Sequence, residues 1–242
     1  MNEKKLRALV TGCASGIGHA VSERLRHRGD DVIGIDYQSG GDWITADLGD
    51  STQRETAARE AIHRLGGIDV LVNVAGIYLP TPIEQNNLDD WRKVWSVNLE
   101  APLQLAGFAF GAMQEQRFGR IVNISSVHAK YSRPDCLAYD VAKGGLESAT
   151  RSLALSGASY GILVNAVAPG FVRTKMSLNQ DGIDEADTPE FEREFVATGR
   201  LPLRRAAAAS EIAEAVEWLT SERNTYVTGQ VLTADGGLTA TL

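Results

Sequence analysis

The feature that most constrains the fold is a glycine-rich segment, TGCASGIG, which covers Thr11 to Gly18. It follows a short apolar run, Leu6 to Thr11, and precedes a helical pattern from His19 to His27. Backbone amides at a helix start carry partial positive charge, and glycine lets a diphosphate approach the chain closely. Strand, glycine turn and helix in this order predict a dinucleotide-binding βαβ unit. The alternative is a tight turn without a ligand.

The rest of the chain continues this alternation of apolar runs and helical patterns. The runs predicted as strands are Leu6–Thr11, Asp31–Asp36, Trp43–Asp47, Ile68–Val74, Arg120–Ser125, Ile162–Ala168 and Gly229–Ala234. The later segments predicted as helices are Ser51–Leu65, Leu88–Gln116, Tyr139–Tyr160 and Ser210–Leu219. Regular alternation predicts an α/β Rossmann fold, with a doubly wound, seven-stranded parallel sheet and helices on both faces. Because no Pro-, Gly- or Ser-rich linker divides the chain, one domain over residues 1–242 is expected.

Bulk composition excludes several classes of partner. The formal net charge of −7 argues against nucleic acid, which is bound through clustered Lys and Arg. No run of about 18 apolar residues is present, so no membrane span is expected. The two cysteines, Cys13 and Cys136, do not form the dense pattern of a secreted disulfide scaffold. These features predict a soluble, cytoplasmic protein.

A carboxylate at Asp36 bears on the choice of cofactor. It ends the second predicted strand, about 20 residues beyond the glycine turn, where an acidic side chain can accept hydrogen bonds from the adenosine ribose and would repel a 2′-phosphate. Tyr37 stands where an Arg would be expected for NADP, and Ser15 before Gly16 is not basic. The sequence therefore favours NAD over NADP. The alternative is that Asp36 only ends a strand.

Ser126 to Lys143 (SVHAKYSRPDCLAYDVAK) contains a candidate acid/base device. Tyr139 and Lys143 are four residues apart on a predicted helix and so share one face. A free tyrosine has a pKa of about 10, and lowering it by about 3 units would require about 4 kcal/mol of preferential phenolate stabilisation. The ammonium of Lys143 and a positively charged nicotinamide are the expected sources.

From Arg173 to about Arg200 the periodic pattern is lost, and the segment is acidic, with seven Asp or Glu residues between Asp181 and Glu194. A long irregular segment after the carboxyl end of a strand is typical of an active-site lid, because open α/β sheets bind ligands at that edge. We therefore predict a lid insertion over about 173–205. A solvated acidic insertion is the alternative.

With these motifs in order, the chain resembles the short-chain dehydrogenase/reductase family over nearly its whole length. The resemblance implies that Tyr139 is the general acid/base, that Lys143 also binds the nicotinamide ribose, and that Ser126 binds the substrate oxygen. It further implies that Asn98 holds a water that passes the proton toward solvent. NVAG at Asn73 to Gly76 departs from the family's NNAG through Val74. The cofactor-binding residues implied are Gly12, Ser15, Gly16, Ile17, Gly18, Asp36, Asp47, Leu48, Asn73, Ala75, Gly76, Tyr139, Lys143, Pro169, Gly170, Val172 and Thr174.

The expected activity is reversible, NAD-dependent oxidation of a secondary alcohol, and no metal site is predicted. The polar loop after Ser126 favours a sugar, polyol or cyclic diol, and His128 is the candidate substrate-binding residue. The alternative is that it is a surface or core-edge residue, which a lone histidine is more often. The alternatives are a 3-oxoacyl thioester reductase and, in another class, a non-catalytic NAD-sensing regulatory protein. The resemblance also implies a homotetramer paired through Leu88–Gln116, Tyr139–Tyr160 and the last strand.

Overall fold

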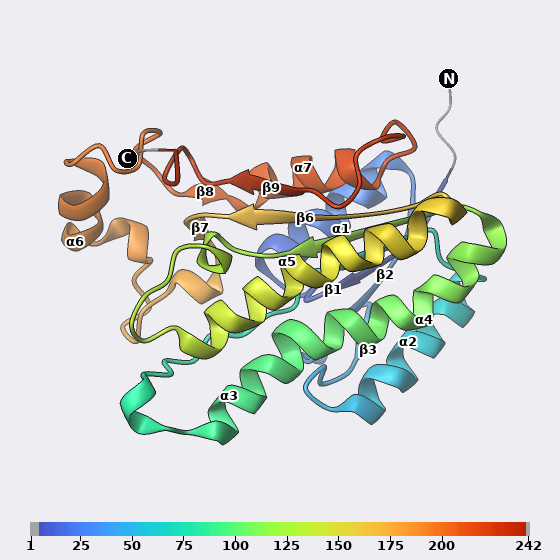
Figure 1. Cartoon of the computed structure of the whole chain (residues 1–242), viewed down its shortest axis with the longest axis horizontal. Coiled ribbons are helices and arrows are strands. Elements are labelled where there is room, and N and C mark those ends of the chain that lie inside the picture. Colours follow the sequence, from blue (N-terminus) through green and yellow to red (C-terminus); the bar gives the residue numbers. More distant parts are fainter. Residues whose placement is uncertain (1–4, 241–242) are drawn as a thin grey trace.

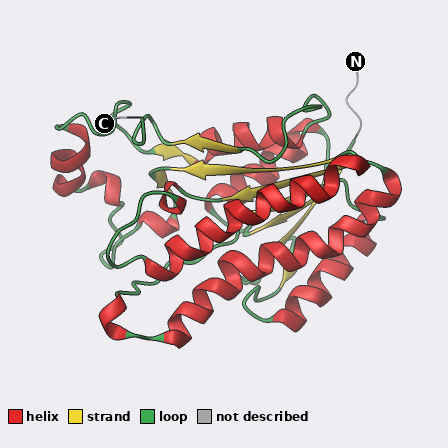
Figure 2. Ribbon diagram, viewed as in Figure 1, coloured by secondary structure: helices red, strands yellow, loops and turns green. Residues whose placement is uncertain are grey.

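The computed structural model describes residues 5–240 and confirms the predicted fold class. Seven parallel strands form one sheet in the order β3-β2-β1-β4-β5-β6-β9 (Figures 1 and 2). Chain order reverses between β1 and β4, so ligand is expected at the carboxyl ends of these two strands. The strands are β1 (Arg7–Thr11), β2 (Asp31–Asp36), β3 (Ile44–Thr45), β4 (Val70–Asn73), β5 (Gly119–Ile124), β6 (Ile162–Pro169) and β9 (Val231–Ala234).

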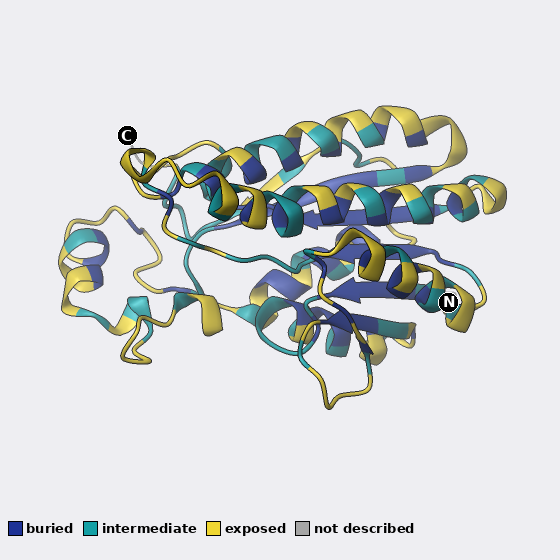
Figure 3. Cartoon of the chain, turned by 90° about the horizontal axis from the view of Figure 1, so that it is seen from below, coloured by how far each residue is buried: buried dark blue, intermediate teal, exposed yellow. Residues whose placement is uncertain are grey.

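Helices cover both faces of this sheet because successive strand side chains point to opposite sides. In β1, Ala8 and Val10 join an apolar cluster beneath α1 (Gly16–Arg28) and α7 (Ala209–Thr220). Leu9, between them, joins the cluster on the other face. The helices on that other face are α2 (Ser51–Leu65), α4 (Ala101–Gln116) and α5 (Leu137–Gly157). Figure 3 shows the buried strands between these exposed helical surfaces.

Helix α2 has both of its predicted ends because its capping signals are local. Asp50 accepts hydrogen bonds from the backbone N–H groups of Thr52 and Gln53, at 2.8 and 3.0 Å. Gly66 ends the helix with φ of 67°, a left-handed conformation that favours glycine. Helix α1 differs: it begins at Gly16 and not at His19, so the last glycines of the turn belong to its first turn.

The predicted helix over Leu88–Gln116 is interrupted. Helix α3 (Leu88–Trp95) runs into a π-helical segment, Ser96–Glu100, before α4 begins. In that segment the N–H of Ala101 bonds to the carbonyl of Ser96, five residues back. Asn98 lies in the middle of the π segment. Such segments are rare and often lie at functional sites.

The predicted lid has more secondary structure than its sequence pattern indicates. Short strands β7 (Val172–Arg173) and β8 (Ala207–Ala208) pair at its base, and α6 (Pro189–Phe191) continues into a π-helical turn, Glu192–Val196. Figures 1 and 3 both show the α6 region projecting from the body beyond the carboxyl edge of the sheet. A small apolar cluster holds the segment together: Phe171, Ala186, Phe191, Phe195, Val196, Leu201 and Leu238. The expectation of an irregular segment is therefore wrong over this part.

None of the helices within residues 5–240 is both long enough and apolar enough to cross a membrane.

Candidate active site

Ser126, Tyr139 and Lys143 meet at the carboxyl edge of the sheet. Ser126 follows β5 and caps a short 3-10 turn, where its Oγ accepts the N–H of His128 at 3.1 Å. Tyr139 lies in the first turn of α5, and its side chain is hydrogen-bonded to that of Ser126. The Lys143 ammonium lies 5.5 Å from the centroid of the Tyr139 ring. The side chains of Ser126 and Lys143 therefore both lie beside the phenol of Tyr139, as the spacing of the three residues predicts.

Burial sets the pKa values of both titratable groups. It raises the pKa of Tyr139 to about 12, and the hydrogen bond from Ser126 opposes this only in part. Burial lowers the pKa of Lys143 to about 8. The Lys143 ammonium donates to the carbonyl of Ile124 at 2.8 Å. In the chain by itself, the pKa of Tyr139 is therefore raised and not lowered. The expected lowering depended on a positively charged nicotinamide as well as on the ammonium of Lys143.

Asn98 is fully buried and uses its side chain to hold the loop after β4. Its Oδ1 accepts the N–H of Ile77 at 2.8 Å, and its Nδ2 donates to the carbonyl of Ile77, also at 2.8 Å. Gly76 lies beside this amide: an added Cβ would come 3.3 Å from Asn98 Oδ1. The contacts of Asn98 thus show that it positions this loop. Its role in a proton relay stays a prediction.

The glycine turn forms a cradle that side chains would fill. Gly12 has φ of +67°, and a Cβ there would lie 3.0 Å from the Cα of Ala75. A Cβ on Gly18 would lie 2.1 Å from the carbonyl oxygen of Gly12. Gly16 has φ of +55°, and its Cβ would meet Thr174 Cγ2 at 3.2 Å. The bare backbone at the start of α1 fits a bound diphosphate.

Asp36 faces this turn from the end of β2. One carboxylate oxygen accepts the N–H of Ala14 and the other accepts the N–H of Gln38, both at 3.0 Å. Each oxygen can accept a second hydrogen bond, so the group keeps capacity for ribose hydroxyls. Asp47 is exposed and accepts the N–H of Gly49 at 2.7 Å, whereas Leu48 is buried in the core.

The end of β4 is held by polar contacts to its neighbours. Thr11 Oγ accepts the N–H groups of Val74 and Ala75 at 2.9 and 3.0 Å. Asn73 donates to Asn123 Oδ1 of β5 at 2.8 Å. Val74, where the family has Asn, packs against the apolar cluster under α1 and α7. The remaining predicted cofactor residues lie along the same edge, in α1, at the end of β6 and in or beside β7: Ser15, Ile17, Pro169, Gly170 and Val172.

Two aromatic rings flank Tyr139, and only one of them was a predicted site residue. The ring of His128 lies 5.7 Å from that of Tyr139 between centroids, and the ring of Tyr78 lies 5.9 Å away, both edge-on. Tyr78 gave no periodic or motif signal in the sequence. It reaches the site because the loop after β4 pairs with the start of α5 through a bridge between Thr81 and Cys136.

His128, Cys136 and Asp140 bring one ligand-type atom each within 4.8 Å of one another. His128 Nδ1 and Asp140 Oδ1 are already 2.8 Å apart, a hydrogen-bond distance. Burial raises the pKa of the Cys136 thiol to about 11.

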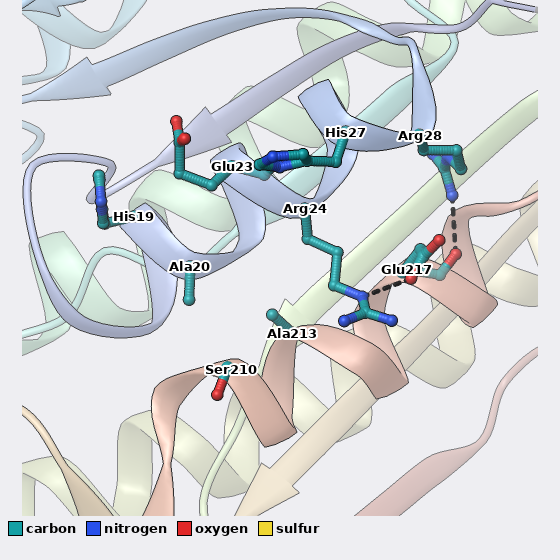
Figure 4. Close-up of a pocket in the computed structure, with 9 residues that line it drawn as sticks. All are labelled: His19, Ala20, Glu23, Arg24, His27, Arg28, Ser210, Ala213 and Glu217. Atoms are coloured by element: carbon teal, nitrogen blue, oxygen red, sulfur yellow. Dashed lines mark hydrogen bonds and ion pairs between the residues drawn. The ribbon is translucent and has the colours of Figure 1, made fainter.

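A hollow of about 600 Å³ between α1 and α7 lies on the other face of the sheet from α5, which carries Tyr139 (Figure 4). Its cationic side chains are paired: Arg24 binds Glu217 and Glu214, and Arg28 binds Asp30. A second hollow, of about 470 Å³, is lined by His128, Asp140 and the loop between them. The second is the one beside the candidate site.

Comparisons with known proteins show which family the chain belongs to. A family model described as enoyl-(acyl carrier protein) reductase matches residues 12–239. The chain is 37% identical to the oxidoreductase YohF of Escherichia coli (strain K12), over 95% of this chain and 94% of that protein. It is 34% identical to a glucose 1-dehydrogenase of Gluconobacter oxydans (strain 621H), over 96% and 91%. The structure of aldohexose dehydrogenase from Thermoplasma acidophilum superimposes with a TM-score of 0.88 at 30% identity, over 100% of this chain and 96% of that one.

The chain belongs to the short-chain dehydrogenase/reductase family. It is therefore an oxidoreductase of a family whose Rossmann fold binds a nicotinamide cofactor.

Proposed function

We propose that the protein is an NAD-dependent oxidoreductase that reversibly converts a secondary alcohol into a carbonyl compound, with Tyr139 as general acid/base. One observation carries the proposal: a single phenol contacts a serine hydroxyl and a buried ammonium beside a glycine cradle. The non-catalytic alternative, an NAD-sensing protein, has no need of this arrangement. The three side chains favour the enzyme.

The residues around the cradle would hold the cofactor. Gly12, Gly16 and Gly18 leave the α1 backbone open to the diphosphate, and Asp36 would accept from the adenosine ribose. Lys143 would donate to the nicotinamide ribose. When bound, NAD⁺ supplies a positively charged ring that takes up a hydride.

In oxidation, the alcohol carbon loses its hydrogen with two electrons and the hydroxyl proton passes to Tyr139. Ser126 would donate to the substrate oxygen. With a pKa of about 12, the phenol is protonated at neutral pH, so in the chain alone it is an acid and a poor base. Bringing this pKa to neutrality requires about 7 kcal/mol of preferential phenolate stabilisation. The positive charge of bound NAD⁺ would supply part of it, so binding of the oxidised cofactor would itself activate the base.

Asp36 supports NAD as the preferred cofactor. Its carboxylate is fixed at the end of β2, where a 2′-phosphate would bring like charges together. Tyr37, the next residue, carries no positive charge that could compensate, and neither does Ser15.

The substrate is a sugar, polyol or cyclic diol in this proposal. Polar side chains in the loop after Ser126 support it, as does similarity to proteins named as glucose and aldohexose dehydrogenases. A second candidate is reduction of a 3-oxoacyl thioester. It is favoured by 35% identity to a 3-oxoacyl-(acyl-carrier-protein) reductase of Haemophilus influenzae (strain ATCC 51907 / DSM 11121 / KW20 / Rd), over 96% of this chain and 97% of that protein.

Assembly as a homotetramer belongs to the same proposal. The elements expected at its interfaces carry exposed apolar side chains: Leu103 on α4, Val141 and Leu155 on α5, and Leu232 on β9. Leu155 is 83% exposed in the isolated chain. Light scattering at micromolar concentration tests this, and a monomer would contradict it.

Substitution of the phenol tests the enzymatic assignment. Tyr139→Phe should lower turnover by at least about 10² while leaving NAD binding nearly unchanged, because only the transferable proton is removed. Tyr160→Phe, in the 3-10 turn that follows the same helix, is the matched control and should keep full turnover. The assay is a panel of sugars, diols and 3-oxoacyl thioesters, each with NAD(H) and NADP(H). Normal turnover by Tyr139→Phe would refute the assignment.

A further inference from the structure

Two rings, those of Tyr78 and His128, pack edge-on against Tyr139, and the polar end of each is hydrogen-bonded to an aspartate. On one side, Tyr78 donates its hydroxyl to Asp135 Oδ2 at 3.1 Å. On the other, His128 Nδ1 lies 2.8 Å from Asp140 Oδ1. The flanking groups are therefore oriented by hydrogen bonds to aspartates and not by packing alone.

The carboxylate of Asp140 fixes the chemistry of the imidazole. An ionised carboxylate only accepts hydrogen bonds, so His128 Nδ1 must be the donor of the pair. In the neutral ring, Nε2 then carries a lone pair and is an acceptor. Over residues 5–240, Nε2 has no hydrogen-bond partner. The side chain of His128 is 23% exposed and that of Asp140 is 11% exposed, so the acceptor borders solvent while its support is mostly buried.

Tyr78, the other ring, is different because its polar contacts are already satisfied. Its hydroxyl donates to Asp135 and is also 3.6 Å from the Cys136 thiol, which in turn lies 3.5 Å from Asp135 Oδ1. Tyr78, Asp135 and Cys136 thus form a closed set beside the phenol. Of the two flanking rings, His128 is the one that offers an unused acceptor.

A metal ion held by His128, Cys136 and Asp140 is a weaker explanation of the same cluster. Two ligands at about 2.0–2.1 Å from one tetrahedral zinc ion are about 3.3 Å apart, and the His128–Asp140 contact of 2.8 Å is shorter. A thiol must also lose its proton to bind a metal, and burial opposes this for Cys136. The hydrogen-bonded pair accounts for the geometry without an ion.

The backbone places the free acceptor beside the reacting groups. The N–H of His128 donates to Ser126 Oγ, the same hydroxyl that bonds Tyr139. A substrate oxygen bound between Ser126 and Tyr139 would therefore lie beside the imidazole, with the neighbouring carbon of the substrate closest to it. An acceptor at that place selects a substrate that donates, namely a second hydroxyl.

We propose that His128 and Asp140 form a subsite that recognises a hydroxyl on the carbon next to the reacting one. Nε2 of His128 accepts from that hydroxyl, and Asp140 is a positioning residue that acts through His128. The substrate class is then vicinal diols and polyols, or the corresponding hydroxyketones in reduction. Simple secondary alcohols and 3-oxoacyl thioesters lack the donor. This inference rests on the proposed alcohol oxidation at Tyr139.

Matched substrates that differ by one hydroxyl test the subsite. The two pairs are cis-1,2-cyclohexanediol with cyclohexanol, and 2,3-butanediol with 2-butanol, each oxidised with NAD⁺. For the wild-type protein, kcat/KM should be higher for each diol than for its partner. His128→Ala should lower kcat/KM for each diol about tenfold more than it lowers kcat/KM for the partner alcohol, which is about the worth of one hydrogen bond. His128→Gln, which restores an acceptor oxygen, should recover part of the loss.

The variant Asp140→Asn tests whether Asp140 acts by orienting the imidazole of His128 or only by packing against it. An asparagine there has nearly the same shape, but its amide can donate to Nδ1 and stabilise the tautomer with a proton on Nε2. The diol preference, measured as the ratio of kcat/KM within each pair, should fall toward that of His128→Ala. Tyr78→Phe, on the closed side of the phenol, should keep the diol preference.

Several results would overturn the subsite. The first is an equal loss of kcat/KM on both members of a pair in His128→Ala. The second is the absence of a diol preference in the wild-type protein. The third is diol activity that EDTA abolishes in the wild-type protein but not in His128→Ala. The last would assign the cluster to a metal. If the wild-type protein oxidises no alcohol in the panel, the proposed function fails together with the subsite. If it oxidises simple alcohols through Tyr139 without a diol preference, only the subsite fails.

Discussion

The ammonium of Lys143 donates to the carbonyl of Ile124 across 2.8 Å, which ties α5 to the last residue of β5. Only 3% of Lys143 is exposed, and burial lowers its pKa from the usual 10.5 to about 8. Within residues 5–240, this ammonium makes no hydrogen bond to a carboxylate, and it lies beside the candidate phenol. Burying this ammonium therefore lowers the free energy of unfolding. Hydroxyl groups of a bound cofactor would offset the loss by accepting hydrogen bonds from Lys143.

This cost predicts a pH-dependent gain in stability on substitution by Met. Below about pH 8, Lys143 is protonated in both folded and unfolded chains, so the whole cost of burial is present. Between about pH 8 and 10.5 the folded chain loses its proton first, the unfolded chain binds more protons, and wild-type stability rises with pH. At pH 7, the free energy of unfolding of Lys143→Met should exceed that of the wild-type protein by about 2 kcal/mol. Removing the buried charge contributes about 3 kcal/mol, and losing the hydrogen bond to Ile124 costs about 1 kcal/mol.

Urea unfolding without cofactor at pH 7 and pH 10 measures this difference, which should shrink at the higher pH. Lys130→Met removes an exposed lysine from the neighbouring loop and should show neither effect. A Lys143→Met protein less stable than wild type at pH 7 would mean that the hydrogen bond to Ile124 outweighs the burial cost.

Asp36 should control the choice between NAD and NADP. Two unit charges about 4 Å apart repel by about 1 kcal/mol in water and about 4 kcal/mol at an effective dielectric constant of 20. Asp36→Asn removes this repulsion and keeps one acceptor, so the ratio of kcat/KM with NAD to that with NADP should fall by about tenfold or more. Asp31→Asn, at the exposed start of the same strand, is the control. An unchanged ratio in Asp36→Asn would exclude the carboxylate from cofactor selection.

Features governed by local chemistry were predictable from the sequence. Strand and helix alternation depends on side-chain periodicity, and the cap at Asp50 and the stop at Gly66 depend on neighbouring residues only. Three parts of the site could be predicted for the same reason: the glycine cradle, the carboxylate at Asp36, and the spacing of Tyr139 and Lys143. Each is set within one element or one turn.

Features that depend on contacts between distant segments were not predictable. The π-helical segment around Asn98 has an ordinary amphipathic sequence, and the contact of Tyr78 with Tyr139 joins residues 61 positions apart, as their numbers show. The lid phenylalanines are spread over an acidic segment with no period, so their shared cluster appears only when the chain folds back. The raised pKa of Tyr139 depends on burial, which the motif alone does not specify.

Asn98 should contribute to stability through the loop that it holds. Asn98→Ala leaves the N–H and the carbonyl of Ile77 without their partner in a buried place, so the free energy of unfolding should fall by about 2–4 kcal/mol. Asn98→Asp keeps the acceptor but loses the donor and introduces a buried charge, so its loss should be at least as large at pH 7. Urea unfolding measures both. Losses below about 0.5 kcal/mol would show that water replaces the amide without cost.

The predicted lid segment is held together by its own aromatic cluster. We therefore expect that a substitution in this cluster can loosen the segment while the sheet stays folded. Phe195 is mostly buried and packs edge-on against Phe171, with centroids 4.7 Å apart, and it also contacts Phe191 at 5.4 Å. Because these partners belong to the lid and its base, Phe195→Ala should loosen the segment while the main transition of thermal unfolding stays within a few degrees of the wild-type value. Trypsin should then cut after Arg193 or Arg200 under conditions in which the wild-type protein is resistant.

Activity distinguishes a lid from a solvated acidic insertion. If the segment closes over substrate, Phe195→Ala should raise KM for the alcohol more than it lowers kcat, because ordering the loosened segment would cost binding free energy. Leu178→Ala, at an exposed position in the same segment, is the control and should leave both constants unchanged. A Phe195→Ala protein that is cut by trypsin and yet keeps the wild-type KM would show that the segment takes no part in binding, and the acidic insertion would then be the better description.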